Sequence, residues 1–217
     1  MAEIVKSGSS QTEVDDAALA RAIAALRTGD PIVYPTETFY GIGADAFSTE
    51  ALERIFAIKG RDAAKTIALI AHDEASAFAI ASEVPDLARR LARAFWPGPL
   101  TIVMPARDGI PPALVGPGGG IGVRVSSHPV ACALAHGLGH PITATSANLS
   151  GAAPARTTAE ARATLSDQID VFVEGGTLAG GMPSTVIECD RDGWKLIREG
   201  AISADQIKAI LLVNPVS

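Results

Sequence analysis

Short apolar runs of strand length alternate with segments of helical periodicity through most of this 217-residue chain. Strands that alternate with helices, and later follow one another directly, predict a mixed α/β (α+β) fold, a twisted mixed β-sheet with helices packed on it. The run at 66–71 is apolar throughout, which favours an interior strand covered on both faces. Strand-length runs begin at 31, 66, 100, 121, 141, 171, 184 and 194, and helical patterns cover 15–27, 49–58, 74–82, 86–94, 129–138, 158–165 and 204–212.

The composition predicts one domain with an aliphatic core. Hydrophobic residues make up 47% of the chain but aromatic residues only 5%, so the core must consist mostly of Ala, Leu, Ile and Val. No internal repeat, low-complexity tract or linker divides the sequence. We therefore expect a single domain over 1–217, with a short polar segment at 1–11 and a short tail at 213–217.

The charge balance disfavours a protein whose main task is to grip a nucleic-acid backbone. The net charge is −6 and the pI is near 5.2, whereas such proteins carry a basic face. No apolar stretch approaches the roughly 20 residues that a membrane span needs. We expect a cytoplasmic protein without membrane contact.

The cysteines and histidines do not form a recognisable metal or redox motif. Cys132 and Cys189 are far apart, which predicts small buried hydrophobic residues in a reducing compartment rather than a disulfide or a zinc site. His136 and His140 have Gly137 and Gly139 between them, which disfavours a helical two-histidine site. We expect no metal site built from protein side chains.

Polar residues follow the first predicted strand directly, at the point where it ends. Pro35 stops the ladder, and Thr36, Thr38 and Tyr40 supply hydroxyl groups that donate and accept hydrogen bonds. The glycines of the run at 41–43 let backbone approach a ligand closely. This strand end is therefore a candidate binding site.

Two cations, Lys59 and Arg61, follow the predicted helix at 49–58. They complement the negative end of the helix macrodipole, or they form an anion clamp at the rim of a cleft. Their spacing alone does not decide between these two interpretations.

Arg124 stands in the centre of the short strand at 121–125, where an apolar residue is expected. A buried arginine needs an anionic partner, which is either a protein carboxylate or a substrate carboxylate held bidentately. Later along the chain, Ser146 and Asn148 follow an apolar strand start and either cap the next element or bind a ligand.

Several strand ends thus carry polar chemistry, and open α/β sheets bind ligands at strand ends. One shared concave, cationic cleft is the economical hypothesis. The glycine-rich loops at 105–120 and 174–183 are candidate approaches to it, the first being either a lid or a solvent loop. Trp96, between a helix and a Pro-Gly turn, is expected in the core rather than as a stacking platform for a base. No Gly-x-Ser-x-Gly or His-Glu-x-x-His motif occurs, which favours cationic positioning of an anionic substrate.

The chain resembles the threonylcarbamoyl-AMP synthase (YrdC-like) family over nearly its whole length, in its single-domain form. Seven motifs in order at family-like separations carry the resemblance. They are Pro-Thr-Glu-Thr-x-Tyr-Gly at 35–41, Lys-x-Arg at 59–61, Pro-Gly-Pro-Leu-Thr at 97–101, Gly-Val-Arg at 122–124, Thr-Ser-Ala-Asn-x-Ser-Gly at 145–151, Pro-Ser-Thr-Val at 183–186 and Arg-Glu-Gly at 198–200.

The resemblance implies an enzyme that joins L-threonine, bicarbonate and ATP into threonylcarbamoyl-AMP and releases pyrophosphate. A downstream transferase complex passes the group to an adenosine of tRNA, which implies a weak tRNA contact. Mg²⁺ would be held mainly by the ATP phosphates. By motif position, the L-threonine contacts are Thr36, Arg124, Ala144 and Ser184, the ATP contacts are Lys59, Arg61, Ser146, Asn148 and Arg198, and the catalytic residues are Lys59 and Arg61.

The chain departs from the family pattern at Asp62 and Ser126, where the family usually has proline. An inactive paralogue and a non-catalytic RNA-binding or ribosome-maturation module on the same fold are the competing hypotheses. A sugar-phosphate lyase-like protein is a third, but it needs acidic metal ligands and a catalytic histidine, whereas these motifs supply mainly hydroxyls and cations.

Overall fold

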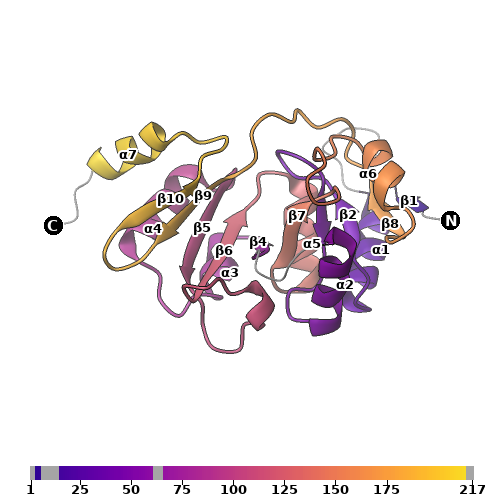
Figure 1. The fold of residues 1–217 in the computed structure, drawn as a ribbon, viewed down its shortest axis with the longest axis horizontal. Helices are drawn as coiled ribbons and strands as arrows, with labels where there is room; N and C mark the ends of the chain where they lie inside the picture. Colours follow the sequence, from indigo (N-terminus) through magenta and orange to yellow (C-terminus); the bar gives the residue numbers. More distant parts are fainter. Residues whose placement is uncertain (1–2, 6–14, 61–65, 214–217) are drawn as a thin grey trace.

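The structure is a computed structural model, and it describes residues 3–5, 15–60 and 66–213. These residues form one mixed sheet of ten strands in the order β1-β8-β2-β3-β7-β4-β6-β5-β9-β10 (Figure 1). The predicted mixed sheet with helices packed on it is confirmed. The strands are β1 (Glu3–Val5), β2 (Ile32–Tyr34), β3 (Gly41–Gly43), β4 (Ala68–Ala71), β5 (Leu100–Pro105), β6 (Gly120–Val125), β7 (Ile142–Ser146), β8 (Val171–Val173), β9 (Thr185–Cys189) and β10 (Trp194–Arg198).

Seven α-helices and one 3₁₀ turn lie in the described ranges. Figure 1 shows α1, α2 and α6 grouped around the β1–β8–β2 end of the sheet and α4 and α7 near β9 and β10. The elements are α1 (Asp16–Arg27), α2 (Thr49–Lys59), α3 (Glu74–Phe78), α4 (Asp86–Phe95), η1 (Pro112–Leu114), α5 (Pro129–Leu138), α6 (Thr158–Leu165) and α7 (Ala204–Val213). None of these helices is long and apolar enough to cross a membrane.

Strand β4 is interior, as its unbroken apolar run predicts. It pairs in parallel with β6 and antiparallel with β7. Leu69 and Ala71 belong to the larger core cluster, whereas Ile70 packs with residues of α1 and α5 in a second cluster. Because successive strand side chains point to opposite faces, this division shows that apolar groups cover both faces of β4.

Side chains alternate between two faces along β5, β6 and β9. Ile102, Val123 and Ile187 lie on one face, in the same buried cluster as residues of α4 and α7. Their neighbours along each strand point to the opposite face. That second face carries the candidate site described below.

Two sequence predictions inside the core are confirmed. Trp96 packs against the larger core cluster, its indole Nε1 donates to the Leu100 carbonyl at 2.6 Å, and its ring lies 5.7 Å from that of Phe78. Cys189 is fully buried, and burial raises the pKa of its thiol to about 12, so it behaves as a small hydrophobic residue. Cys132 is only partly buried.

The helix expected over 74–82 is wrong beyond Phe78. Ala81 instead forms a bridge with Ala106, and the Ser82 amide donates to the Pro105 carbonyl at 2.9 Å. These hydrogen bonds to the end of β5 replace the helical ones. Tertiary pairing that lies 23 residues away in sequence therefore ends the helix early.

The glycines at 41–43 form strand β3, which the sequence did not predict. A Cβ atom at Gly43 would lie 2.7 Å from the Tyr34 ring, so glycine here makes room for a buried aromatic ring on the neighbouring strand. The expectation that Gly43 admits a ligand is therefore wrong. Gly41 does line the cavity described below.

We predict that Gly43→Ala lowers the free energy of unfolding by about 1–3 kcal/mol, the usual cost of overpacking a core. The Tyr34 ring is fully buried and its hydroxyl donates to the Thr143 carbonyl at 2.9 Å, so it cannot move away freely. Urea denaturation measures the effect. Gly118→Ala is the control, because its new Cβ meets no atom closer than 3.8 Å. Equal stability of the two variants would contradict this packing account.

Candidate functional site

A cavity of about 500 Å³ lies on one face of the sheet. Its floor consists of alternate residues of neighbouring strands, as expected when side chains on one face point the same way. The floor residues are Thr101 and Val103 of β5, Gly120, Gly122 and Arg124 of β6, Ala144 and Ser146 of β7, Val186 and Glu188 of β9, and Ala68 of β4.

Small residues in the central strands leave room for this cavity. A Cβ atom at Gly120 would lie 2.7 Å from Val103 Cγ1, and one at Gly122 would lie 3.3 Å from Thr101 Cγ2. The two glycines therefore let the β5 side chains lean over β6. The short alanine side chains of β4 and β7 continue the depression across the sheet.

The first glycine-rich loop forms a wall of the cavity. Gly116, Pro117 and Gly118 line it, and the Gly116 amide donates to the Gly120 carbonyl at 2.8 Å. A second bond, from the Gly119 amide to the Gly116 carbonyl, closes the turn. The segment 105–120 is therefore not only a solvent loop, because part of it lines the cavity.

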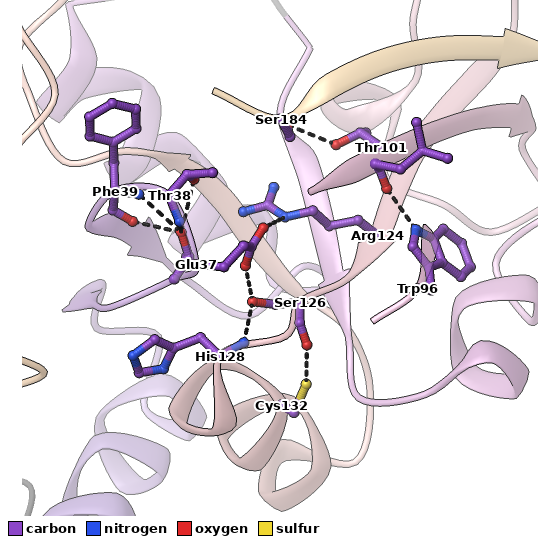
Figure 2. Close-up of polar contacts among 12 residues, drawn as sticks. Glu37, Thr38, Phe39, Trp96, Thr101, Arg124, Ser126, His128, Cys132 and Ser184 are labelled. Carbon is purple, nitrogen blue, oxygen red and sulfur yellow. Dashed lines mark hydrogen bonds and ion pairs between the residues drawn. The ribbon is translucent and has the colours of Figure 1, made fainter. Parts of the chain in front are cut away.

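Arg124 is buried with 7% of its side chain exposed, and its Nε donates to Glu37 Oε1 at 3.1 Å (Figure 2). The protein carboxylate that the sequence left as one alternative is therefore present. Neither Nη atom of Arg124 makes a hydrogen bond within the described part of the chain, and the residue lines the cavity. Both Nη atoms of one planar guanidinium, with their four N–H donors, therefore remain available to a ligand.

Ser184 and Arg198 lie together at another part of the lining. The Ser184 hydroxyl is 3.1 Å from the Thr101 hydroxyl, and Arg198 Nη2 donates to the Ser184 carbonyl at 2.8 Å and to its Oγ at 3.2 Å. The structure thus brings an arginine and two hydroxyls together, and Figure 2 shows Ser184 and Thr101 close to Arg124.

Thr36 also lines the cavity and is 2% exposed. Its hydroxyl donates to the Phe39 carbonyl at 2.7 Å, which folds the segment after β2 into a tight turn. Tyr40 lines the cavity beside it and donates its hydroxyl to the Gly176 carbonyl at 2.8 Å. Burial raises the Tyr40 pKa, so the phenol stays a neutral donor.

Lys59 does not lie at the rim of the cavity, and that expectation is wrong. The residue is 2% exposed and does not line the cavity. Its Nζ donates to the carbonyls of Ser146 and Asn148, both at 2.6 Å, and to Asn148 Oδ1 at 3.0 Å. The chain after β7 wraps around the C-terminal end of α2, where the Ser150 hydroxyl donates to the Lys59 carbonyl at 2.7 Å.

Ser146 lines the cavity, whereas Asn148 does not. The Asn148 amide nitrogen donates to the Ala152 carbonyl at 2.5 Å, and its Oδ1 accepts from the Ser146 hydroxyl at 2.5 Å. Asn148 therefore stabilises the turn after β7, as the capping interpretation predicts, and its contact with a ligand stays a prediction.

The charge of the cavity is less one-sided than expected. Its charged lining residues in the described ranges are Arg124, Arg198 and Glu188. Arg61 and Asp62 lie outside the described residues, so the cationic cleft and the role of Arg61 stay predictions.

Sequence reasoning assigned no role to Glu37, Thr101 or Glu188. Glu188 could have been found from its spacing, because it lies four residues after Ser184, and an even spacing along extended backbone places side chains on one face. Glu37 gave a weaker signal, as the acid within the hydroxyl-rich run that follows β2. Its pairing with Arg124 joins positions 87 residues apart, which a local pattern does not reveal.

No group of three or more His, Cys, Asp or Glu side chains in the described ranges could hold a metal ion. Magnesium held mainly by the phosphates of a nucleotide therefore stays a prediction.

We predict that Lys59→Ala lowers the free energy of unfolding by about 1–3 kcal/mol, because it leaves buried oxygen acceptors without their donor. Chemical denaturation followed by circular dichroism measures this loss. Lys208→Ala, at a position whose side chain is 58% exposed, is the control and should change stability by less than about 0.5 kcal/mol. A Lys59 variant as stable as the control would show that these bonds contribute nothing.

Comparison with known proteins places this architecture in a family. The Sua5/YciO/YrdC family model, described as "Telomere recombination", matches residues 24–200. A threonylcarbamoyl-AMP synthase of Bacillus subtilis is 36% identical over 93% of this chain and 58% of its own length. One from Photobacterium profundum is 35% identical over 84% of this chain and 98% of its own length.

A solved structure agrees with these relatives. The structure of Pyrococcus abyssi Sua5 in complex with L-threonine superposes with a TM-score of 0.90 at 30% identity, covering 96% of this chain and 61% of that one. The chain thus spans about three fifths of the B. subtilis and P. abyssi proteins and nearly all of the P. profundum protein. Sequence, fold and the residues of the cavity lead to one conclusion: this chain belongs to the Sua5/YciO/YrdC family.

Proposed function

We propose that this chain is a threonylcarbamoyl-AMP synthase, which makes threonylcarbamoyl-AMP and pyrophosphate from L-threonine, bicarbonate and ATP. The observation that carries the proposal is the buried Arg124, whose two Nη atoms have no hydrogen bond among the described residues and which lines a hydroxyl-rich cavity. The family membership and the L-threonine complex of the P. abyssi relative support it.

The L-threonine site consists of Arg124 with the hydroxyl groups around it. The planar guanidinium suits a carboxylate, which accepts two parallel hydrogen bonds from it. Thr36, Ser184 and the backbone at Ala144 lie along the same cavity and supply contacts to the rest of the amino acid. This arrangement orients the amino group of threonine toward the nucleotide.

The ATP site is assigned to Lys59, Arg61, Ser146, Asn148 and Arg198. The threonine nitrogen bonds to the carbon of bicarbonate, whose hydroxyl leaves as water with a proton from the amine, to give a carbamate. A carbamate oxygen then attacks the α-phosphorus while pyrophosphate leaves. Cations stabilise the negative charge that builds up on the phosphates. The observed contacts give Lys59 a second role, because its Nζ holds the carbonyls of the turn that carries Ser146. To reach a phosphate, Lys59 exchanges these carbonyls for phosphate oxygens.

The remaining expectations concern the surroundings of the enzyme. We propose Mg²⁺ bound to the triphosphate with several waters retained, a downstream tRNA-modifying transferase as the consumer of the product, and a weak contact with tRNA. We also propose a cytoplasmic location. A non-catalytic RNA-binding module is less well supported, because its binding would need a basic surface and the chain carries a net charge of −6.

We predict that the protein releases pyrophosphate from ATP and bicarbonate only when L-threonine is present. A coupled pyrophosphate assay measures the rate, with L-serine in place of L-threonine as the control for side-chain recognition. Release at the same rate without an amino acid would refute the proposal. If no release occurs, RNA binding that falls steeply with salt would favour the RNA-binding alternative instead.

We predict that Ser184→Ala raises the KM for L-threonine by roughly three- to tenfold, because one hydrogen bond to substrate is lost. The KM for ATP should change by less than about twofold, and it serves as the control within the same assay. The Ser184 hydroxyl contacts Thr101 and Arg198, and Arg198 keeps its hydrogen bonds to the Ser184 carbonyl when that hydroxyl is removed. An unchanged KM for L-threonine would remove Ser184 from the threonine site.

A further inference from the structure

Three groups outside the assigned site form a continuous hydrogen-bonded chain behind Arg124 (Figure 2). The His128 amide donates to the Ser126 hydroxyl oxygen at 3.1 Å, the Ser126 hydroxyl contacts Glu37 Oε2, and Arg124 Nε donates to Glu37 Oε1 at 3.1 Å. Ser126 is 0% exposed, and the side chains of Glu37 and Arg124 are 10% and 7% exposed. This series of hydrogen bonds is therefore largely screened from water.

The direction of each hydrogen bond follows from its donors. Because the Ser126 oxygen accepts from a backbone N–H, its own proton is free to point at the Glu37 carboxylate. Both carboxylate oxygens of Glu37 are then engaged, one by Ser126 and one by Arg124. A carboxylate held at both oxygens cannot rotate without losing a hydrogen bond, so Glu37 presents a fixed acceptor to Arg124.

This fixed acceptor selects which edge of the guanidinium meets a ligand. Arginine can grip a carboxylate through its two Nη atoms or through Nε and one Nη. Glu37 occupies the Nε of Arg124, so the Nε-containing edge is already in use. The edge with the two Nη atoms is the one left to a ligand in the cavity.

We propose that Ser126 is a positioning residue, which acts through Glu37 to hold Arg124 with its two Nη atoms presented to the carboxylate of the amino-acid substrate. The inference rests on the proposed function and adds to it a residue that does not line the main cavity. Ser126 touches no substrate in this account. Its contribution is to keep Glu37, and hence the arginine plane, in one orientation.

A merely structural role for Ser126 is the competing explanation. Its hydroxyl accepts from the amide of His128, the N-cap of α5, and its carbonyl accepts from the Cys132 thiol at 2.9 Å. A structural role would change stability, and it would weaken every ligand of the cavity alike. The test must therefore separate carboxylate recognition from general damage.

The test compares two ligands that differ at the carboxylate only. Calorimetric titration of L-threonine and of L-threoninamide into the wild-type protein and into Ser126→Ala gives four dissociation constants. We expect Ser126→Ala to raise the Kd for L-threonine roughly three- to tenfold, the effect of one weakened hydrogen bond. The Kd for L-threoninamide should change less than about twofold, because a neutral amide gains little from the two charged Nη groups of Arg124.

Two further variants distinguish a specific effect of Ser126→Ala from a general one. Ser82→Ala is the matched control, since it removes a serine hydroxyl that donates to the Pro105 carbonyl at 3.3 Å at an exposed position. It should leave both dissociation constants unchanged. In an Arg124→Lys background, which lacks the planar guanidinium, Ser126→Ala should change the Kd for L-threonine by less than about twofold. The effects of substitutions at residues that act together are not additive.

Three outcomes would overturn the inference alone. Equal weakening of both ligands by Ser126→Ala would show a structural role only, and so would the same loss in the Arg124→Lys background. Wild-type affinity of Ser126→Ala for L-threonine would overturn the inference while leaving the proposed function intact. A wild-type protein that binds no L-threonine would instead overturn the proposed function, and this inference with it.

Discussion

The ion pair between Arg124 and Glu37 is the interaction on which the candidate site depends. An ionised guanidinium in an interior strand requires a counter-charge, and removing one partner of such a buried pair typically costs about 3–5 kcal/mol. Glu37 lies 87 residues away in sequence, so the pair ties the segment after β2 to β6. That tie brings Thr36 and Tyr40 to the cavity that the β6 residues line. The same contact that allows a buried charge therefore assembles one side of the site.

A second constraint is that the two faces of the sheet carry different kinds of side chain. One face of β5, β6 and β9 carries Ile102, Val123 and Ile187 against the helices, which stabilises the fold. The opposite face of these strands carries glycine, threonine, valine, arginine and glutamate, which leaves a hollow with hydrogen-bonding groups. Strand geometry imposes this alternation, so stability and binding are encoded by different residues of the same strands.

The sequence predicted what depends on local pattern. The helix at 158–165 has the expected bounds, because its capping threonine and its apolar spacing lie within a few residues of each other. Arg124 was recognised as a paired, buried charge because it interrupts an apolar strand. The burial of Lys59 was not predicted, because its acceptors lie 87 and 89 residues further along the chain. The strand order and the early end of α3 likewise depend on pairings that no local window contains.

The central claim is that Arg124 receives the carboxylate of L-threonine in the cavity on this face of the sheet. A crystal structure of the protein with L-threonine and a non-hydrolysable ATP analogue tests it most directly. The account predicts both carboxylate oxygens at about 3 Å from the two Nη atoms of Arg124, with the Glu37 contact to Nε retained. A threonine carboxylate bound elsewhere in the cavity, or one that displaces Glu37 from Nε, would contradict it.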